Sequence, residues 1–315
     1  MNIISNALKG AAMGIAEIIP GVSGGTIAFI TGIYERLLNC IKAFNFSLIK
    51  TFKESGVKGV WEAIDGMFLL TLIMGMGFGV IVGVFGVTHL LENYPEPLWA
   101  FFFGLIIASA VYIGKQIPSW RASEFVLIAI GVIVAYGITI LPVGEGSKSL
   151  LYVFLAGTIA ISALILPGIS GSFMLLLMGM YTYIIPSIKL ALKEQDPEAL
   201  MVLIVFAGGC LVGLLTFARV LSWTFKNYHS PTLALLTGFM IGSLNKIWPW
   251  RIPLEQIQAA DGELKTVTES NLMPNAYDAI AGNESHLVLC IVTAIIGFAV
   301  VFLLERLDNS QPEEA

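Results

Sequence analysis

Residues 16–37 read AEIIPGVSGGTIAFITGIYERL, and a related stretch, LILPGISGSFMLLLMGMYTYI, occupies residues 164–184. Both stretches are apolar, and both are interrupted by a Pro-Gly pair that is followed by serine and glycine. Proline lacks the amide hydrogen that a helix needs, and both residues are poor helix formers. We therefore expect a helix break in the middle of each apolar stretch.

The composition indicates an integral membrane protein. Of the 315 residues, 57% are hydrophobic and 12% are charged, whereas soluble domains carry about 25% charged residues. The net charge of −5 predicts no nucleic-acid partner. The three cysteines are far apart in the sequence and form no CxxC pair, so we expect no metal site, no disulfide and no cofactor.

A membrane-spanning helix needs about 20 apolar residues. Six segments meet this length roughly, at residues 67–91, 98–114, 125–141, 200–223, 232–248 and 287–304. Two further segments, 3–34 and 150–186, are longer, but each is cut near its middle by Pro-Gly. Each half is too short to cross a bilayer, which predicts re-entrant hairpins that turn inside the membrane and leave by the face they entered.

The chain is an internal duplication. Pro20 and Pro167 begin matching PG[VI]SG motifs 147 positions apart, and NYPEPLWAFFFGLIIAS from Asn93 matches NYHSPTLALLTGFMIGS from Asn227. We place the first repeat at residues 1–141 and the second at 150–304. The predicted fold is an all-α integral membrane protein in which each repeat is a re-entrant helical hairpin plus three transmembrane helices.

The parity of this arrangement predicts an inverted topology. A hairpin does not change sides and three spans do, so the second repeat must lie upside down relative to the first. Lysine and arginine are more frequent in the segments that share a side with the N-terminus, which favours both termini in the cytoplasm. Residues 42–65 are then a cytoplasmic amphipathic linker, and residues 251–283 form an external polar loop.

Inverted repeats with broken helices are typical of secondary transporters, whose substrate lies where the breaks meet. A helix that starts at each break presents unpaired N–H groups and the positive end of its dipole, which suits an anion. The candidate substrate-binding residues at the two starts are Ser23, Gly24, Gly25, Thr26, Ser170, Gly171 and Ser172. The alternative is that these serines and glycines only cap and pack the short helices.

Four other side chains are candidates. Glu17 lies three residues before Pro20, and the matching position is Leu164, so the hairpin fold does not require an acid there. An acid inside the membrane indicates ion or proton coupling, the alternative being a helix cap. Arg219 could neutralise a phosphate, pair with Glu17 or extend to the cytoplasmic interface. Tyr34 and Tyr181 could bond a headgroup or anchor the hairpins at the interface.

The motifs GIAEIIPGVSGGTIAFITGIYERL and LILPGISGSFMLLLMGMY, with the six spans, resemble the bacterial polyprenyl-phosphate transporter family over roughly residues 3–304. The resemblance implies an inner-membrane translocase that returns undecaprenyl phosphate from the outer to the inner leaflet. It carries Glu17, Ser23, Gly24, Ser170 and Gly171 over as motif positions, whereas Arg219 is a candidate on physical grounds alone. No enzyme activity is expected, and the sequence does not specify an oligomeric state.

Two other functions remain open. Undecaprenyl-diphosphate phosphatases also use inverted repeats with hairpins rich in proline and serine, but their chemistry requires a histidine and an arginine close to the motifs. Neither hairpin contains a histidine, so nothing evident would stabilise a transferring phosphoryl group. A transporter of a small soluble anion is the second alternative, because a helix-start site does not report whether its anion carries a lipid tail.

Overall fold

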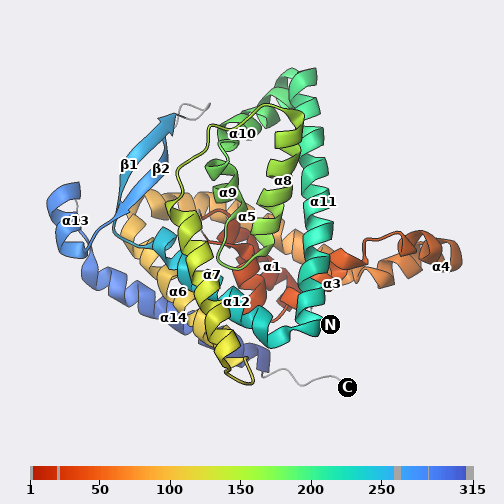
Figure 1. Ribbon diagram of the computed structural model, residues 1–315, viewed down its shortest axis with the longest axis horizontal. Helices are drawn as coiled ribbons and strands as arrows, with labels where there is room; N and C mark the ends of the chain where they lie inside the picture. Colours follow the sequence, from red (N-terminus) through yellow and green to blue (C-terminus); the bar gives the residue numbers. More distant parts are fainter. Residues whose placement is uncertain (1–2, 20–21, 259–263, 283, 310–315) are drawn as a thin grey trace.

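The computed structural model describes residues 3–19, 22–258, 264–282 and 284–309, which are mostly helical (Figure 1). The first half of the chain forms α1 (Ile3–Glu17), α2 (Gly24–Ile30), α3 (Tyr34–Ala43), α4 (Ser47–Ala63), α5 (Gly66–Asn93), α6 (Pro95–Lys115) and α7 (Ala122–Ile140). The second half forms α8 (Leu150–Ile165), α9 (Gly171–Leu177), α10 (Tyr181–Lys189), η1 (Leu190–Glu194), α11 (Pro197–Asn227), α12 (His229–Ser243), η2 (Leu244–Ile247), α13 (Pro274–Ala281) and α14 (Leu287–Asn309).

Among the described residues, four helices are long and apolar enough to cross a membrane, namely α5, α6, α7 and α11. Helices α9 and α10 pass the same test together, although they meet at 116°. Helix α12, expected to continue to residue 248, ends at Ser243, and the described apolar part of α14 is also shorter than a full span. The chain is therefore a multi-pass helical membrane protein whose helices differ in length.

Both long apolar stretches are broken. In the first, α1 ends at Glu17 and α2 begins at Gly24, while Pro20 and Gly21 lie outside the described residues. In the second, α8 ends at Ile165 and α9 begins at Gly171. Each break therefore leaves a helix of 15 or 16 residues followed by one of seven residues.

Close helix packing repeats between the two halves. Helix α1 packs against α5 in the first half, as α8 packs against α11 in the second. A Cβ added at Gly75 would lie 2.1 Å from the carbonyl oxygen of Ala7, and a Cβ at Gly209 would lie 2.1 Å from that of Phe154. Ala7 and Phe154 are 147 positions apart, the offset of the PG[VI]SG motifs. Glycine is needed at both contacts because two helix backbones touch there.

Two pairs of packed helices join the two halves of the chain. Helix α6 packs against α14 from the other half, and α12 packs against α7 in the same way. A Cβ at Gly104 would lie 2.0 Å from the carbonyl oxygen of Ala294, and one at Gly238 would lie 2.4 Å from that of Ile128. The two halves therefore form one intertwined helical body rather than two separate domains.

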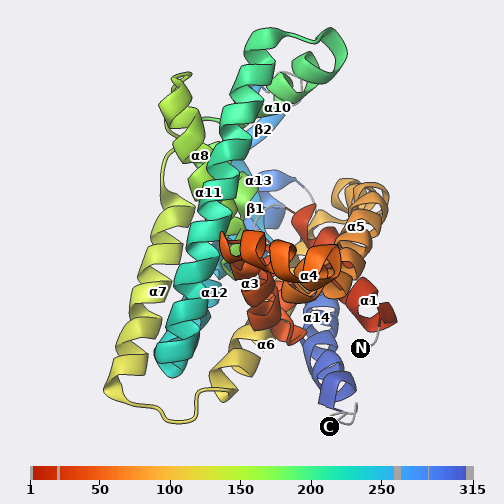
Figure 2. The same cartoon turned by 90° about the vertical axis from the view of Figure 1, so that its right-hand side faces the viewer.

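Two segments lie outside this helical body. Helix α4 buries no residue; it projects from the side of the body in Figure 1 and lies in front of it in Figure 2. The segment expected as an external polar loop contains strands β1 (Arg251–Gln258) and β2 (Leu264–Asn271), which pair antiparallel with Pro253 opposite Glu269. The fold thus adds a β-hairpin to the predicted helices, and this hairpin proves important for the site.

Candidate functional site

The N–H groups at the first helix start are bonded by side chains of the same hairpin. Glu17 Oε1 accepts a hydrogen bond from the amide of Gly24 at 2.7 Å, and Ser23 Oγ accepts one from the amide of Gly25 at 3.1 Å. Glu17 therefore caps α2 in this structure. The carboxylate occupies the position where an external anion would meet the start of α2.

The two helix breaks contact each other directly. Ser23 Oγ donates to the carbonyl oxygen of Leu164 at 3.1 Å, and the amide of Gly168 donates to Thr26 Oγ1 at 3.0 Å. Ser23 and Thr26 are buried, with 1% and 0% of their surface exposed. These two predicted site residues therefore join the hairpins to each other.

The two candidate tyrosines lie in different surroundings. Tyr34 is buried, and its hydroxyl donates to the carbonyl oxygen of Ile165 at 3.1 Å. Its ring packs against Phe29 and Phe225. Tyr181 is half-buried and lines a cavity. Tyr34 thus fastens the first hairpin to the second, whereas Tyr181 is accessible to a ligand in the cavity.

The second helix start is more open than the first. Ser170 Oγ accepts a long hydrogen bond of 3.5 Å from the amide of Phe173 and lies 2.9 Å from Ser172 Oγ. Ser170 and Gly171 are buried, and Gly171 packs closely against the carbonyl oxygen of Ala160. Ser172 is exposed and lines the same cavity as Tyr181.

This cavity has a volume of about 440 Å³ and lies between the two hairpins and the β-hairpin. Both apolar stretches, helix α6 and the residues after α12 contribute to its wall, which consists of Glu17, Ile18, Trp99, Ser172, Phe173, Leu176, Tyr181, Lys246, Arg251 and Glu269. The wall combines apolar side chains with two cations, Lys246 and Arg251, and two carboxylates, Glu17 and Glu269. It can therefore accommodate a group with an anionic part and an apolar part.

The two cations share one carboxylate. Lys246 Nζ lies 2.7 Å and Arg251 Nη1 2.9 Å from the same oxygen, Glu269 Oε2. All three side chains are largely withdrawn from solvent, with exposed fractions of 14% for Lys246, 7% for Arg251 and 21% for Glu269. We call these three residues the basic triad. Their formal charges sum to +1, and the carboxylate of Glu17 on the same cavity wall balances this charge when it is ionised.

Arg251 has contacts on several sides, but not all of its N–H groups have a hydrogen-bond partner among the described residues. Its guanidinium lies 4.1 Å from the centre of the Trp99 ring and also donates to the carbonyl oxygen of Lys246. Its buried Nε has no hydrogen-bond partner among the described residues. Burial lowers the pKa of the guanidinium, and the Glu269 carboxylate opposes this shift. A guanidinium is a bidentate donor to phosphate or carboxylate, so the position suits such an anion.

Arg219 lies away from this cavity. It is exposed on α11 and donates to the carbonyl oxygen of Phe44 at 3.0 Å. The cations that line the cavity are Lys246 and Arg251, which the sequence analysis treated only as charges of an external segment. The sequence after Arg251, IPLEQIQ, alternates only in part between apolar and polar residues and contains Pro253, so the signal for a strand was weak. Nothing local indicated that this strand lies beside the two broken helices.

The structure defines the class as a multi-pass membrane protein whose broken helices meet beside a cavity that contains two cations and two carboxylates. A family model described as VCA0040-like, undecaprenyl phosphate translocase-like, matches residues 13–265, and the chain belongs to this family. It is 42% identical over 306 residues to a polyprenyl-phosphate transporter of Vibrio cholerae serotype O1, covering 97% of both chains. It is 31% identical over 258 residues to a polyprenyl-phosphate transporter of Staphylococcus aureus, covering 78% of this chain and 86% of that one. No solved structure matches the chain.

Proposed function

We propose that this chain is a translocase for undecaprenyl phosphate, which it returns from the outer to the inner leaflet of the bacterial inner membrane. One observation carries the proposal most strongly. The cavity between the two broken helices holds two buried cations against one shared carboxylate, beside aromatic and aliphatic side chains. A polyprenyl phosphate has the same division into one anionic headgroup and one apolar tail, and the named relatives support this class of substrate.

The headgroup contacts follow from which side chains are accessible. Lys246 and Arg251 neutralise the phosphate, while the hydroxyls of Ser172 and Tyr181 lie on the same cavity wall and donate to it. Ser170 and Gly171 position the start of α9 beneath these groups. The apolar tail remains in the lipid, so the cavity has to enclose only the headgroup and the first part of the chain.

The first hairpin has a different role in this proposal. The amides of Gly24 and Gly25 are bonded to Glu17 and Ser23, and Ser23 and Thr26 also bond the second hairpin. These groups hold the two breaks together in the present state. They meet the headgroup only if Glu17 leaves the start of α2, which gives the acid a place in the transport cycle.

We therefore propose Glu17 as the coupling residue. Its carboxylate bonds the amide of Gly24 and also lines the cavity, so it can respond to the arrival of an anion. Uptake of a proton or a cation by Glu17 would remove its repulsion of the phosphate and free the start of α2. This links headgroup binding to an ion gradient without requiring another acid in the hairpins.

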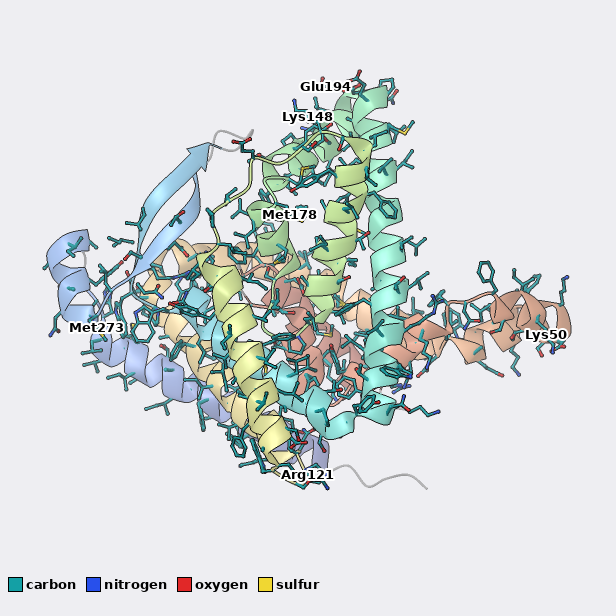
Figure 3. All side chains as sticks on the ribbon, in the orientation of Figure 1. Lys50, Arg121, Lys148, Met178, Glu194 and Met273 are labelled. Atoms are coloured by element: carbon teal, nitrogen blue, oxygen red, sulfur yellow. The ribbon has the colours of Figure 1, made fainter. Side chains whose placement is uncertain are left out.

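The proposed topology has inverted repeats, two re-entrant hairpins and both termini in the cytoplasm. The matching glycine contacts in the two halves support the duplication. Figure 3 supports the orientation of the long helices, because Arg121 lies at one end of the molecule and Lys148 and Glu194 lie at the other. Arg121 precedes α7 and Lys148 follows it, so the charged residues mark the two membrane surfaces that α7 connects.

The phosphatase alternative is less well supported by the cavity. No histidine is among its described lining residues, and a phosphatase of this kind needs one to take part in phosphoryl transfer. The small-anion alternative fits the cations equally well but leaves the apolar wall unexplained. Trp99, Phe173 and Leu176 would have no ligand group to contact if the substrate were inorganic phosphate.

The test is lipid flipping by the purified chain in proteoliposomes. A fluorescent polyprenyl phosphate should become accessible in the opposite leaflet faster than in empty vesicles, with no release of inorganic phosphate. Lys246→Gln should slow this exchange by tenfold or more, at the scale of one hydrogen bond to a charged group, while Lys53→Gln on the exposed α4 should not. Release of inorganic phosphate from the corresponding polyprenyl diphosphate would instead favour the enzyme, and uptake of inorganic phosphate without lipid movement would favour the small-anion transporter.

A further inference from the structure

Glu269 separates two cavities. The first is the cavity between the hairpins described above. The second has a volume of about 370 Å³ and lies at the end of α7, with a polar wall to which Thr139, Asn245 and Asn271 contribute. Lys246 and Glu269 line both cavities, so the ion pair between them forms part of the partition.

Polar contacts attach the β-hairpin that carries Glu269 to the residues that follow α12. Asn271 Nδ2 donates to Asn245 Oδ1 at 2.8 Å, and Trp248 Nε1 donates to the carbonyl oxygen of Leu272 at 2.8 Å. The ladder between β1 and β2 is irregular beside Pro253, the residue opposite Glu269. Because Glu269 lines both cavities, a change of its side-chain rotamer would move the carboxylate from one to the other, with the loss of its bonds to Lys246 and Arg251.

The carboxylate of Glu269 occupies the place from which a ligand phosphate could contact both Lys246 and Arg251. Lys246 Nζ and Arg251 Nη1 both point to Glu269 Oε2, so a phosphate oxygen that receives these same two hydrogen bonds takes the place of this carboxylate oxygen. The second cavity has room for the displaced carboxylate, and Asn245 Nδ2, which donates one hydrogen to Thr139 Oγ1, carries a second hydrogen that can bond it. Ligand binding at the triad is thus an exchange of one anion for another.

Such an exchange depends on the charge of the ligand. A phosphate monoester carries a charge of about −1.5 to −2 at pH 7, whereas a phosphodiester carries −1, like the carboxylate that it would replace. A diester therefore gains nothing electrostatically by displacing Glu269. A monoester gains up to one further unit of charge against the same two cations, in a site largely withdrawn from water.

We propose that Glu269 is a displaceable counterion of Lys246 and Arg251, and that this exchange makes the cavity select lipid phosphate monoesters over phosphodiester lipids. The proposal rests on the proposed function and deepens it, because it states how the carrier lipid is told apart from the abundant diester phospholipids around it. Selection arises from the competing carboxylate as well as from attraction to the cations.

The test compares two ligands that differ only in the phosphate. Binding of a short polyprenyl phosphate and of its methyl diester is measured on the full chain in detergent. The wild type should prefer the monoester by about tenfold or more, the scale of one added charge-assisted contact. Glu269→Gln, which removes the competing charge but keeps the side-chain shape, should bind the diester more tightly and reduce this preference by at least about fivefold.

Two variants serve as controls. Glu269→Asp keeps the charge and should retain the preference, and Glu198→Gln removes an exposed acid at the start of α11 and should change nothing. An unchanged ratio in a folded Glu269→Gln variant would overturn the inference. So would a wild type that binds the diester as tightly as the monoester, whether or not the variant folds. Failure of the wild type to bind either ligand would instead refute the proposed function.

Discussion

Substitution of Arg251 is the sharpest test of the cavity, because this side chain contacts its protein neighbours and is proposed to bind the phosphate. Its guanidinium bonds Glu269, donates to the carbonyl oxygen of Lys246 and lies over the ring of Trp99. Arg251→Gln removes the charge and the bidentate donor, whereas Arg251→Lys keeps the charge and removes only the planar fork. The two variants therefore separate the contribution of charge from that of geometry.

The expected magnitudes follow from these contacts. A hydrogen bond to a charged group contributes about 1.5–3 kcal/mol, and each 1.4 kcal/mol is a factor of ten in affinity. Arg251→Gln should therefore weaken binding of a polyprenyl phosphate by about tenfold to a hundredfold. Arg251→Lys should cost less, roughly threefold to tenfold, because Coulomb attraction remains while the fork is lost.

The assay is equilibrium binding of a labelled polyprenyl phosphate to the purified chain, with thermal unfolding as the check on folding. Lys226→Gln, an exposed position at the end of α11, is the matched control and should bind like the wild type. The reasoning fails if folded Arg251→Gln retains wild-type affinity. It also fails if Arg251→Lys is weaker than Arg251→Gln, because charge would then not be the dominant contribution.

Three further predictions concern the hairpins and the topology. Glu17→Gln should still bind the lipid but lose the dependence of flipping on an ion gradient; a wild-type response to the gradient would leave Glu17 with only its capping role. Ser23→Ala and Ser170→Ala should each lower the free energy of unfolding by about 0.5–2 kcal/mol as lost helix caps. The larger loss is expected at Ser23, whose cap bond is 3.1 Å against 3.5 Å, and equal losses would contradict this ranking. In a variant without the native cysteines, cysteines at Lys53 and Glu194 should be labelled from opposite faces of the membrane, and labelling of both from one face would refute the inverted arrangement.

The helical core was largely predictable from hydropathy and from proline and glycine. The segment expected at 67–91 is α5, from Gly66 to Asn93, and the segment expected at 98–114 is α6, from Pro95 to Lys115. These helices are long and apolar, so composition alone reports them. The break in the second stretch was also predictable from its Pro-Gly pair. In the structure Gly168 adopts a positive φ of 84°, which few other residues tolerate.

The end of α12 was not predictable in the same way. The apolar pattern continues through Ile247 and Trp248, but the α-helix ends at Ser243 and is followed by one short 3₁₀ turn. Tertiary contacts account for the end of α12, because Lys246 bonds Glu269 and Trp248 donates to the carbonyl oxygen of Leu272 just after β2. Hydropathy does not report such contacts.

The candidate site was predicted only in part. Ser172 and Tyr181 line the cavity as their positions in the second hairpin motif suggested, and Glu17 reaches it from the first. The cations were missed because Lys246 and Arg251 follow α12 and lie far in sequence from every hairpin residue. Only the path of the β-hairpin brings them beside α9, and a single sequence contains no local signal of that path.

The central claim is that a lipid phosphate binds between the hairpins on the basic triad. The most direct measurement is an experimental structure of the chain in a lipid nanodisc with a polyprenyl phosphate. The account predicts the phosphate within hydrogen-bonding distance of Lys246 and Arg251, with Glu269 turned toward Asn245. A phosphate bound elsewhere, for example beside Arg219 on α11, with the contacts of Glu269 to both cations intact, would contradict it.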